Sequence, residues 1–364
     1  MKILFIVSGI GFGDATREHA NILAVKKKFP KAKIMVAGYD NSYLYFKDKF
    51  DTIQIQGYKL PGKEMKINAL HFGLINIFLP AFWFIGTLKV RLEAFNFIPD
   101  IIVSDFEPVG MSLAKILNKK CIVVFGFDPS LYEEYLKQHK VNLKMKVEAK
   151  YFSKLYDQAY HTIIPTFKKK KNKHLQYTYV NPIIRLNPED LPSEKEIMKE
   201  LGLKTKPILV MLGGSNFGTK LAEQVNRLAP KSKENFIIFG GNLNINFHKN
   251  VQYISFTADF FKYLKVCKGI ITLAGQETLS EALVYKKPIL CFPIEDHIEQ
   301  VLNAYSLRDT IQISHKHTPK AIEEEIKKFI INIPNLELKV KKLNITANGS
   351  EQIAKLIELI TEEI

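Results

Sequence analysis

The chain has 364 residues, which is too long for one ordinary core and suits two domains of ordinary size. Hydrophobic residues make up 46% and charged residues 24%, so neither a disordered chain nor an integral membrane protein is favoured. The net charge of +15 indicates phosphate-bearing ligands or an anionic membrane surface. We expect no nucleic-acid partner, because the chain has no helix-turn-helix, zinc-finger or aromatic RNA-binding pattern.

The cysteines and the first residues indicate the compartment. Cys121, Cys267 and Cys291 are far apart and lie in or beside apolar runs, so they predict neither disulfides nor a zinc site. The apolar run at the start ends after a few residues without a cleavage site, which predicts a first strand and not an export signal. We therefore expect a cytoplasmic protein, with peripheral attachment to the inner face of the membrane left open.

Short apolar runs alternate with helical patterns along the first half of the chain. Strands are predicted at 2–7, 33–37, 101–104, 122–125 and 161–164. Most are unbroken Val, Ile, Leu and Phe runs, as expected where helices cover both faces of a parallel sheet. The stretches between them carry apolar residues at helical spacing. The pattern predicts a doubly wound, Rossmann-like α/β domain over residues 1–166.

The apolar segment 67–86 breaks this rhythm. It includes several phenylalanines and Trp83, basic residues bracket it, and its length approaches the roughly 20 residues of a membrane span. His71, Asn76 and Pro80 interrupt it, so a spanning helix is disfavoured. Two interpretations stay open: a buried helix pair, or a lip that dips into a bilayer beside the basic residues.

The composition changes after Pro165, where a lysine-rich run precedes a stretch with Pro, Glu and Ser. We place the interdomain linker at 167–185. Further strands are then predicted at 207–212, 236–239, 252–254, 269–273 and 289–292. They indicate a second Rossmann-like domain over 186–347. Residues 348–364 have the spacing of an amphipathic helix, for which crossing back to the first domain is one placement.

The strongest functional pattern is a strand, a glycine turn and a helix at 272–284. Gly275 at the strand end lets a ligand approach the backbone, and the free amides of the next helix favour an anion such as pyrophosphate. Glu281 lies one turn after Glu277, and a carboxylate there can accept two hydrogen bonds from a ribose diol. Both glutamates can also be solvated acids that the helix dipole favours.

The run 272–304 resembles the donor-binding signature of family 28 glycosyltransferases, the group of MurG-like and diacylglycerol galactosyltransferase-like enzymes. The resemblance implies the GT-B architecture, with two Rossmann-like domains that face a cleft and the donor held by the second. It also implies roles for individual residues. Diphosphate contacts fall on Gly275, Gln276 and Thr278, the ribose contact on Glu281, and sugar-hydroxyl contacts on Glu299 and Gln300.

Two further segments extend the predicted donor site. The glycine-rich turn at 211–216 is similar to the one that opens the second domain in this family, and its amides and hydroxyl add Gly214 and Ser215 to the diphosphate contacts. Phe256 follows the strand predicted at 252–254 and is our candidate for the base pocket.

The loop after the first strand resembles the GxGxGHxxR form of MurG-related enzymes, with Gly11, Gly13 and Arg17 on the acceptor side. Asp14 stands where that form has histidine, and a carboxylate there also argues against an NAD site. Asp14 can act as the base that takes the acceptor proton, or it can be a helix N-cap with Arg17 as its ion-pair partner. Asp105, at the end of a neighbouring strand, is the reserve candidate for the base.

These patterns predict a hexosyltransferase that uses a nucleotide-diphosphate sugar, with a UDP-sugar as first choice. The acceptor is unknown, and a lipid-linked one is among the options. Inversion at the anomeric carbon is implied by the resemblance alone. No HExxH or paired-carboxylate metal motif is present, so we expect no metal and no cofactor. A sugar-nucleotide epimerase of the same fold and a non-catalytic nucleotide-sugar-binding protein remain alternatives.

Overall fold

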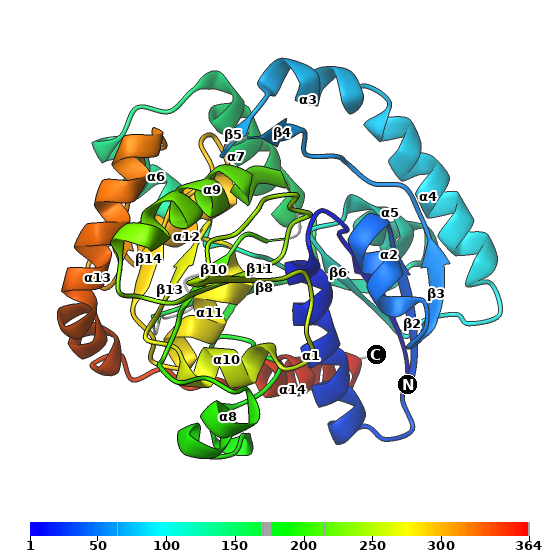
Figure 1. Ribbon diagram of the computed structural model, residues 1–364. Coiled ribbons are helices and arrows are strands. Elements are labelled where there is room, and N and C mark those ends of the chain that lie inside the picture. Colours follow the sequence, from blue (N-terminus) through cyan, green and yellow to red (C-terminus); the bar gives the residue numbers. More distant parts are fainter. Residues whose placement is uncertain (64, 169, 171–175, 214–215, 363–364) are drawn as a thin grey trace. The chain divides into compact units, whose positions relative to one another are not determined.

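A computed structural model describes residues 1–63, 65–168, 170, 176–213 and 216–362 (Figure 1). The chain forms two compact units, each built around its own parallel sheet. The first unit comprises Met1–Pro61, Ala69–Arg185 and Ala347–Ile364, and the second comprises Gly62–Asn68 and Leu186–Thr346.

The first unit contains seven described parallel strands in the order β3-β2-β1-β6-β7-β8-β9. They are β1 (Lys2–Val7), β2 (Lys33–Gly38), β3 (Asp51–Gln54), β6 (Ile101–Asp105), β7 (Lys120–Val124), β8 (His161–Pro165) and β9 (Tyr177–Val180). The helices are α1 (Phe12–Lys28), α2 (Asp40–Phe46), α3 (Ala69–Ile75), α4 (Leu79–Glu93), α5 (Pro108–Leu117), α6 (Leu131–Gln138), α7 (Leu143–Tyr156) and α14 (Gly349–Glu362). The strand order reverses between β1 and β6, so ligands are expected at the carboxyl ends of these two strands.

The second unit contains six described parallel strands in the order β12-β11-β10-β13-β14-β15. They are β10 (Ile208–Met211), β11 (Phe236–Phe239), β12 (Val251–Ile254), β13 (Gly269–Thr272), β14 (Ile289–Cys291) and β15 (Gln312–Ile313), and a short antiparallel pair joins β4 (Gly62–Lys63) to β5 (Lys66–Ile67). The helices are α8 (Glu194–Glu200), α9 (Thr219–Leu228), α10 (Phe260–Val266), α11 (Gln276–Val284), α12 (Ile298–Ser306) and α13 (Pro319–Lys341). Here the order reverses between β10 and β13.

The helix α14 completes the core of the first unit. Its residues Ile353, Ile357 and Ile360 are buried in the same apolar cluster as Ile3 and Phe5 of β1. Figure 1 shows α14 (red) beside α1 (dark blue). The C-terminal helix therefore belongs to the unit that the start of the chain builds.

The beginning of α14 is seated by a close approach of two backbones. A Cβ on Gly349 would lie 2.1 Å from the carbonyl oxygen of Asn181, so only glycine fits without a shift. The Asn181 backbone N–H also donates to Gln352 at 2.8 Å. These contacts fix the chain where it re-enters the first unit.

The fold class expected from the sequence is confirmed, since the chain forms two doubly wound α/β units. All ten predicted strands are present, while β3, β9, β15 and the β4–β5 pair were missed. Strand β9 lies inside the stretch 167–185 that was expected to be a linker, where it extends the first sheet.

The segment 67–86 forms α3 and the first half of α4. Of the two interpretations that the sequence left open, the buried helix pair is wrong in its burial, because side chains such as Leu70 and Phe84 are largely exposed. Among the described residues, no helix is both long and apolar enough to span a membrane.

Candidate active site

The candidate acceptor-side residues meet at the carboxyl ends of β1 and β6, where the first sheet reverses its strand order. Asp14 lies in the first turn of α1, two residues after the helix begins, and Asp105 is the last residue of β6. Gly11 occupies the N-cap position of α1. The N-cap interpretation of Asp14 is therefore wrong, although its ion pair with Arg17 is present at 2.8 Å.

Arg17 connects the two aspartates. Its Nε and Nη2 donate to the two carboxylate oxygens of Asp105 at 2.8 and 2.7 Å, and Nη2 also donates to Asp14 Oδ1 at 2.8 Å. Arg17 and Asp105 are buried, whereas the Asp14 side chain is 21% exposed. Of the two candidate bases, only Asp14 can therefore be reached by an acceptor without rearrangement of the ion pair.

The surroundings of Asp14 suit a base that works near neutral pH. Burial and the negative charge of Asp105 raise the pKa of Asp14 to about 7, although Arg17 and a hydrogen bond from Ser8 act in the opposite direction. A general base is most effective when its pKa lies near the working pH. A carboxylate is ordinarily a weaker base than an imidazole, and the raised pKa of Asp14 reduces this difference.

Glu18 is part of this cluster and was missed from the sequence. It is fully buried, and Asn21 Nδ2 donates to its Oε1 at 3.0 Å. Burial, followed by the charge of Asp105 and a hydrogen bond to it, raises the pKa of Glu18 well above the usual range. The sequence signal that could have identified Glu18 is its position four residues after Asp14, on the same helix face.

Glu107 caps α5 beside the cluster. Its Oε1 accepts from the Val109 N–H at 3.4 Å, and its Oε2 has no hydrogen-bond partner among the described residues. Burial raises the pKa of Glu107 to about 8. The preceding residue, Phe106, has a φ of 55°, which is a strained value for a bulky side chain. Strain and a buried acid thus lie directly after Asp105.

The predicted phosphate site lies at the N-terminus of α11, where the second sheet reverses its strand order. The chain leaves β13 through Ala274, whose φ is 69°, and Gly275 is the N-cap residue. A Cβ on Gly275 would meet no described atom within 4 Å. Open space therefore adjoins the first amides of α11, as a diphosphate would need. Gly214 and Ser215 lie outside the described residues.

The side chains of α11 differ in burial. Gln276 and Glu281 are buried, whereas Glu277 and Thr278 are half-buried. The interpretation as a solvated acid is therefore wrong for Glu281, because a solvated side chain would be exposed.

The loop between β14 and α12 carries the predicted sugar contacts. Gln300 Oε1 accepts from the backbone N–H of Ile294 at 3.0 Å, so this oxygen shapes the loop, and the amide nitrogen can still donate to a sugar hydroxyl. Glu299 is half-buried in the first turn of α12. Phe256 follows β12 and is 83% exposed, which leaves its ring accessible to a base.

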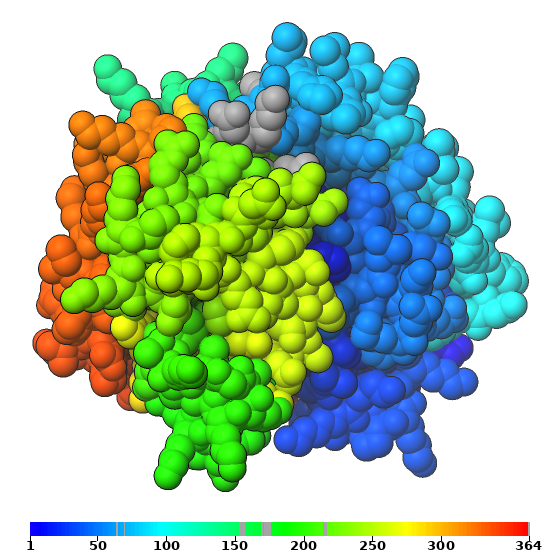
Figure 2. All heavy atoms as spheres, in the orientation of Figure 1, coloured from blue at the N-terminus to red at the C-terminus, as the bar shows by residue number. Residues whose placement is uncertain are grey.

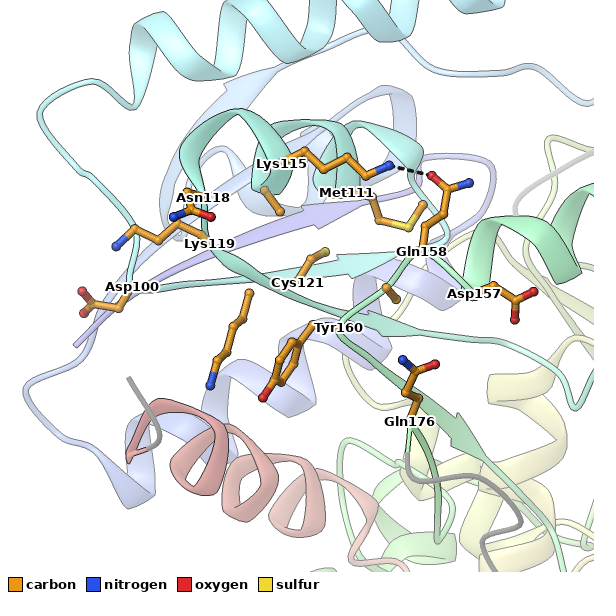
Figure 3. A pocket seen from close by; sticks show the side chains of 13 residues that line it. Asp100, Met111, Lys115, Asn118, Lys119, Cys121, Asp157, Gln158, Tyr160 and Gln176 are labelled. Carbon is orange, nitrogen blue, oxygen red and sulfur yellow. Dashed lines mark hydrogen bonds between the residues drawn. The ribbon is translucent and has the colours of Figure 1, made fainter.

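A pocket of about 670 Å³ lies at the opposite edge of the first sheet, where β7 and β8 begin (Figure 3). Its lining includes Lys115, Lys119 and Tyr160 and none of the predicted site residues. Lys115 donates to Gln158 at 2.8 Å. Ligands of open α/β sheets bind at the carboxyl edge, so this pocket is not our candidate.

No group of three or more His, Cys, Asp or Glu side chains that could hold a metal ion occurs in the described ranges. Metal independence stays a prediction.

The fold is the GT-B architecture, which solved glycosyltransferases share over 99% of this chain. The chain belongs to glycosyl transferase family 1, whose family model matches residues 1–334.

Individual relatives agree with this assignment. A Methanosarcina mazei protein named as an uncharacterized glycosyltransferase is 25% identical over 98% of both chains. A UDP-N-acetylglucosamine--N-acetylmuramyl-(pentapeptide) pyrophosphoryl-undecaprenol N-acetylglucosamine transferase of Lachnoclostridium phytofermentans is 26% identical over 43% of this chain and 47% of its own length. The structure of Medicago truncatula UGT71G1 complexed with UDP-glucose superposes with a TM-score of 0.69, at 14% identity over 99% of this chain and 98% of its own.

Proposed function

We propose that this glycosyltransferase takes a hexose from a nucleotide-diphosphate sugar, with UDP as the nucleotide of first choice, and is family 28-like in specificity. The observation that carries the proposal is the open space beside Gly275 at the N-terminus of α11, with Glu281 buried on the same helix. The name of the bacterial relative, a UDP-N-acetylglucosamine-dependent transferase with a lipid-linked acceptor, supports the donor and the acceptor class.

The donor is held by the second unit in this proposal. The first amides of α11 hold the diphosphate and stabilise the charge that develops as it leaves. Glu281 accepts hydrogen bonds from the ribose hydroxyls, and Phe256 stacks on the base. Gln300, through its amide nitrogen, and Glu299 bind sugar hydroxyls, and Gly214 and Ser215 add diphosphate contacts.

The acceptor hydroxyl is activated in the first unit. Asp14 takes the proton from the hydroxyl oxygen as that oxygen attacks the anomeric carbon. The bond from the anomeric carbon to the diphosphate oxygen breaks, and the nucleoside diphosphate leaves with the electron pair. Attack opposite the leaving group inverts the configuration. Asp105 holds Arg17 and thereby Asp14 in place, and the negative charge of Asp105 helps to raise the pKa of Asp14.

The phosphate site is tested by two substitutions of the same shape, Gly275→Asp and Gly275→Asn. Both residues are good N-caps, and open space receives the new side chain, so both variants should fold. A carboxylate beside the diphosphate costs several kcal/mol of repulsion at short range, so UDP should bind the Asp variant at least ~10-fold more weakly than the Asn variant. Isothermal titration calorimetry measures both.

The activity is tested with UDP-, GDP- and CDP-sugars in thermal-shift and transfer assays, since a bound ligand raises the apparent stability. We expect a shift with a UDP-sugar and a glycosylated product when acceptors are supplied.

Three outcomes would contradict the proposal. In the calorimetric titration, equal UDP affinity of wild type and Gly275→Asp would remove α11 from the site. No shift with any of the three sugars would overturn the proposed donor class, and an epimerised sugar formed without acceptor would indicate an epimerase.

A further inference from the structure

Large apolar side chains are exposed together on three helices of the first unit. On α3 and the turn after it they are Leu70, Leu74, Ile75, Ile77 and Phe78, on α4 and its end Phe84, Ile85, Leu88, Leu92 and Phe95, and on α7 Leu143, Val147 and Tyr151. We call this set the apolar surface. Leu70, Leu92 and Leu143 are each about three-quarters exposed, at 77%, 74% and 76%. Soluble proteins rarely expose so many large apolar side chains together without a binding partner.

On α4 the exposed side chains follow one stripe. Phe84, Leu88 and Leu92 are four residues apart and therefore lie on one face of the helix. The opposite face carries Gly86 and Val90, which are buried where α4 packs on α5. The helix thus has two apolar faces, of which only one is used inside the unit.

Direct contacts join the three helices into one surface. The rings of Trp83 on α4 and Tyr151 on α7 stack with centroids 6.3 Å apart and an angle of 8° between their planes. Lys144 Nζ of α7 lies 5.5 Å from the ring centre of Phe72 on α3. In Figure 2 the sky-blue and cyan atoms of α3 and α4 lie at the outer edge of the visible face.

The charges around the apolar surface are mostly positive. Lys89 and Arg91 on α4 are exposed, and so are Lys146, Lys150 and Lys154 on α7. The acids on the same three helices are balanced by lysines. On α4, Glu93 lies 3.6 Å from the amine of Lys89, and on α7, Glu148 lies 2.6 Å from that of Lys144. The excess of lysine and arginine is left facing solvent.

We propose that the apolar surface docks on a bilayer that contains anionic lipids. The stripe of α4 and the exposed side chains of α3 and α7 enter the headgroup region, while the lysines contact lipid phosphates. A second copy of the chain fits less well, because a symmetric contact would place these basic residues opposite one another. This inference deepens the proposed function, since it gives a lipid-linked acceptor its route to Asp14.

Vesicle flotation with the full chain tests the docking. Phosphatidylcholine vesicles are compared with vesicles of equal parts phosphatidylcholine and phosphatidylglycerol. The test variant is Phe84→Glu/Leu92→Glu, and the matched control is Ile331→Glu/Leu338→Glu, which changes two exposed apolar residues of α13 in the second unit. Wild type and control should float with the anionic vesicles only, and added salt should weaken binding. The test variant should bind at least ~10-fold more weakly, because two apolar side chains that would enter the headgroup region are replaced by charges.

Equal flotation of test variant and wild type would overturn the proposal, and so would wild type that stays unbound. A dimer that the test variant dissociates, without flotation of wild type, would assign the surface to a second copy instead. The thermal shift with UDP-sugars tests the proposed function independently of membrane docking, because donor binding does not involve the apolar surface. Flotation without a donor shift would leave the membrane surface standing and overturn the donor proposal alone.

Discussion

Arg17 binds both Asp14 and Asp105 in the first unit. A buried guanidinium needs compensating charge, and Asp105 supplies it through two hydrogen bonds. Asp14 shares the same guanidinium, but its burial and the charge of Asp105 raise its pKa in spite of the ion pair. The neighbours of Asp14 thus move its pKa toward that of an imidazole.

The first prediction concerns Asp14 as the base. Asp14→Asn keeps the shape and an oxygen for Arg17 but cannot accept the proton, so kcat should fall by about 10²–10⁴-fold. UDP should bind as in wild type in calorimetric titration. Asp48→Asn, at an exposed position of the same unit, is the control and should keep full activity. An unchanged kcat in Asp14→Asn would remove Asp14 from the mechanism.

The second prediction concerns pH. A carboxylate acts as a base only above its pKa, so kcat/KM should rise with pH and reach half its plateau at about 7. Asp105→Asn removes a negative charge that raises this pKa, so the midpoint should move to lower pH in that variant. Initial rates at constant ionic strength measure both profiles. A wild-type rate that stays level down to about pH 5 would contradict the assignment.

At the scale of elements, most of the strands that the sequence analysis missed lie at the edges of the two sheets. The central strands are mostly apolar runs and were all predicted. The missed strands β3 and β9 form the two edges of the first sheet, and β15 forms one edge of the second. An edge strand pairs on one side only and is partly exposed, so its sequence mixes polar and apolar residues, as in Asp51–Gln54.

The third prediction concerns α14 as part of the first core. Ile357 is fully buried against that core, whereas Leu359 on the same helix is 57% exposed. Ile357→Ala should lower the free energy of unfolding by about 2–5 kcal/mol, through lost burial and the cavity left behind. Leu359→Ala should change it by less than about 0.5 kcal/mol. Urea denaturation measures both, and equal losses would show that α14 does not pack as described.

At the scale of the molecule, the two units place their candidate residues in the same way. In each sheet the strand order reverses between two central strands, and candidate residues lie at or after the carboxyl ends of those strands. Asp14 and Asp105 are separated by 91 positions, yet one guanidinium binds both. Gly275 and Phe256 likewise follow the carboxyl ends of strands of one sheet, β13 and β12.

The fourth prediction follows from this placement. UDP should slow amide hydrogen exchange in the loops after β12 and β13 and in the first turn of α11, because these amides would lie against the ligand. The amino edge of the same sheet, before β13, should exchange at its unliganded rate and serves as the internal control. Protection at the amino edge alone would place the nucleotide elsewhere.

The sequence by itself determined the fold class, the central strands and the glycine turns, because apolar runs and helical spacing are local properties of the chain. The sequence also identified Asp14, Asp105, Gly275 and Glu281 as candidate site residues. Only the tertiary structure decided their surroundings. Burial of Arg17, Glu18 and Glu281, the open space at Gly275 and the exposure of α4 depend on segments that are distant in the chain. A side chain's solvation and its pKa are set by everything packed around it, and no local pattern carries that information.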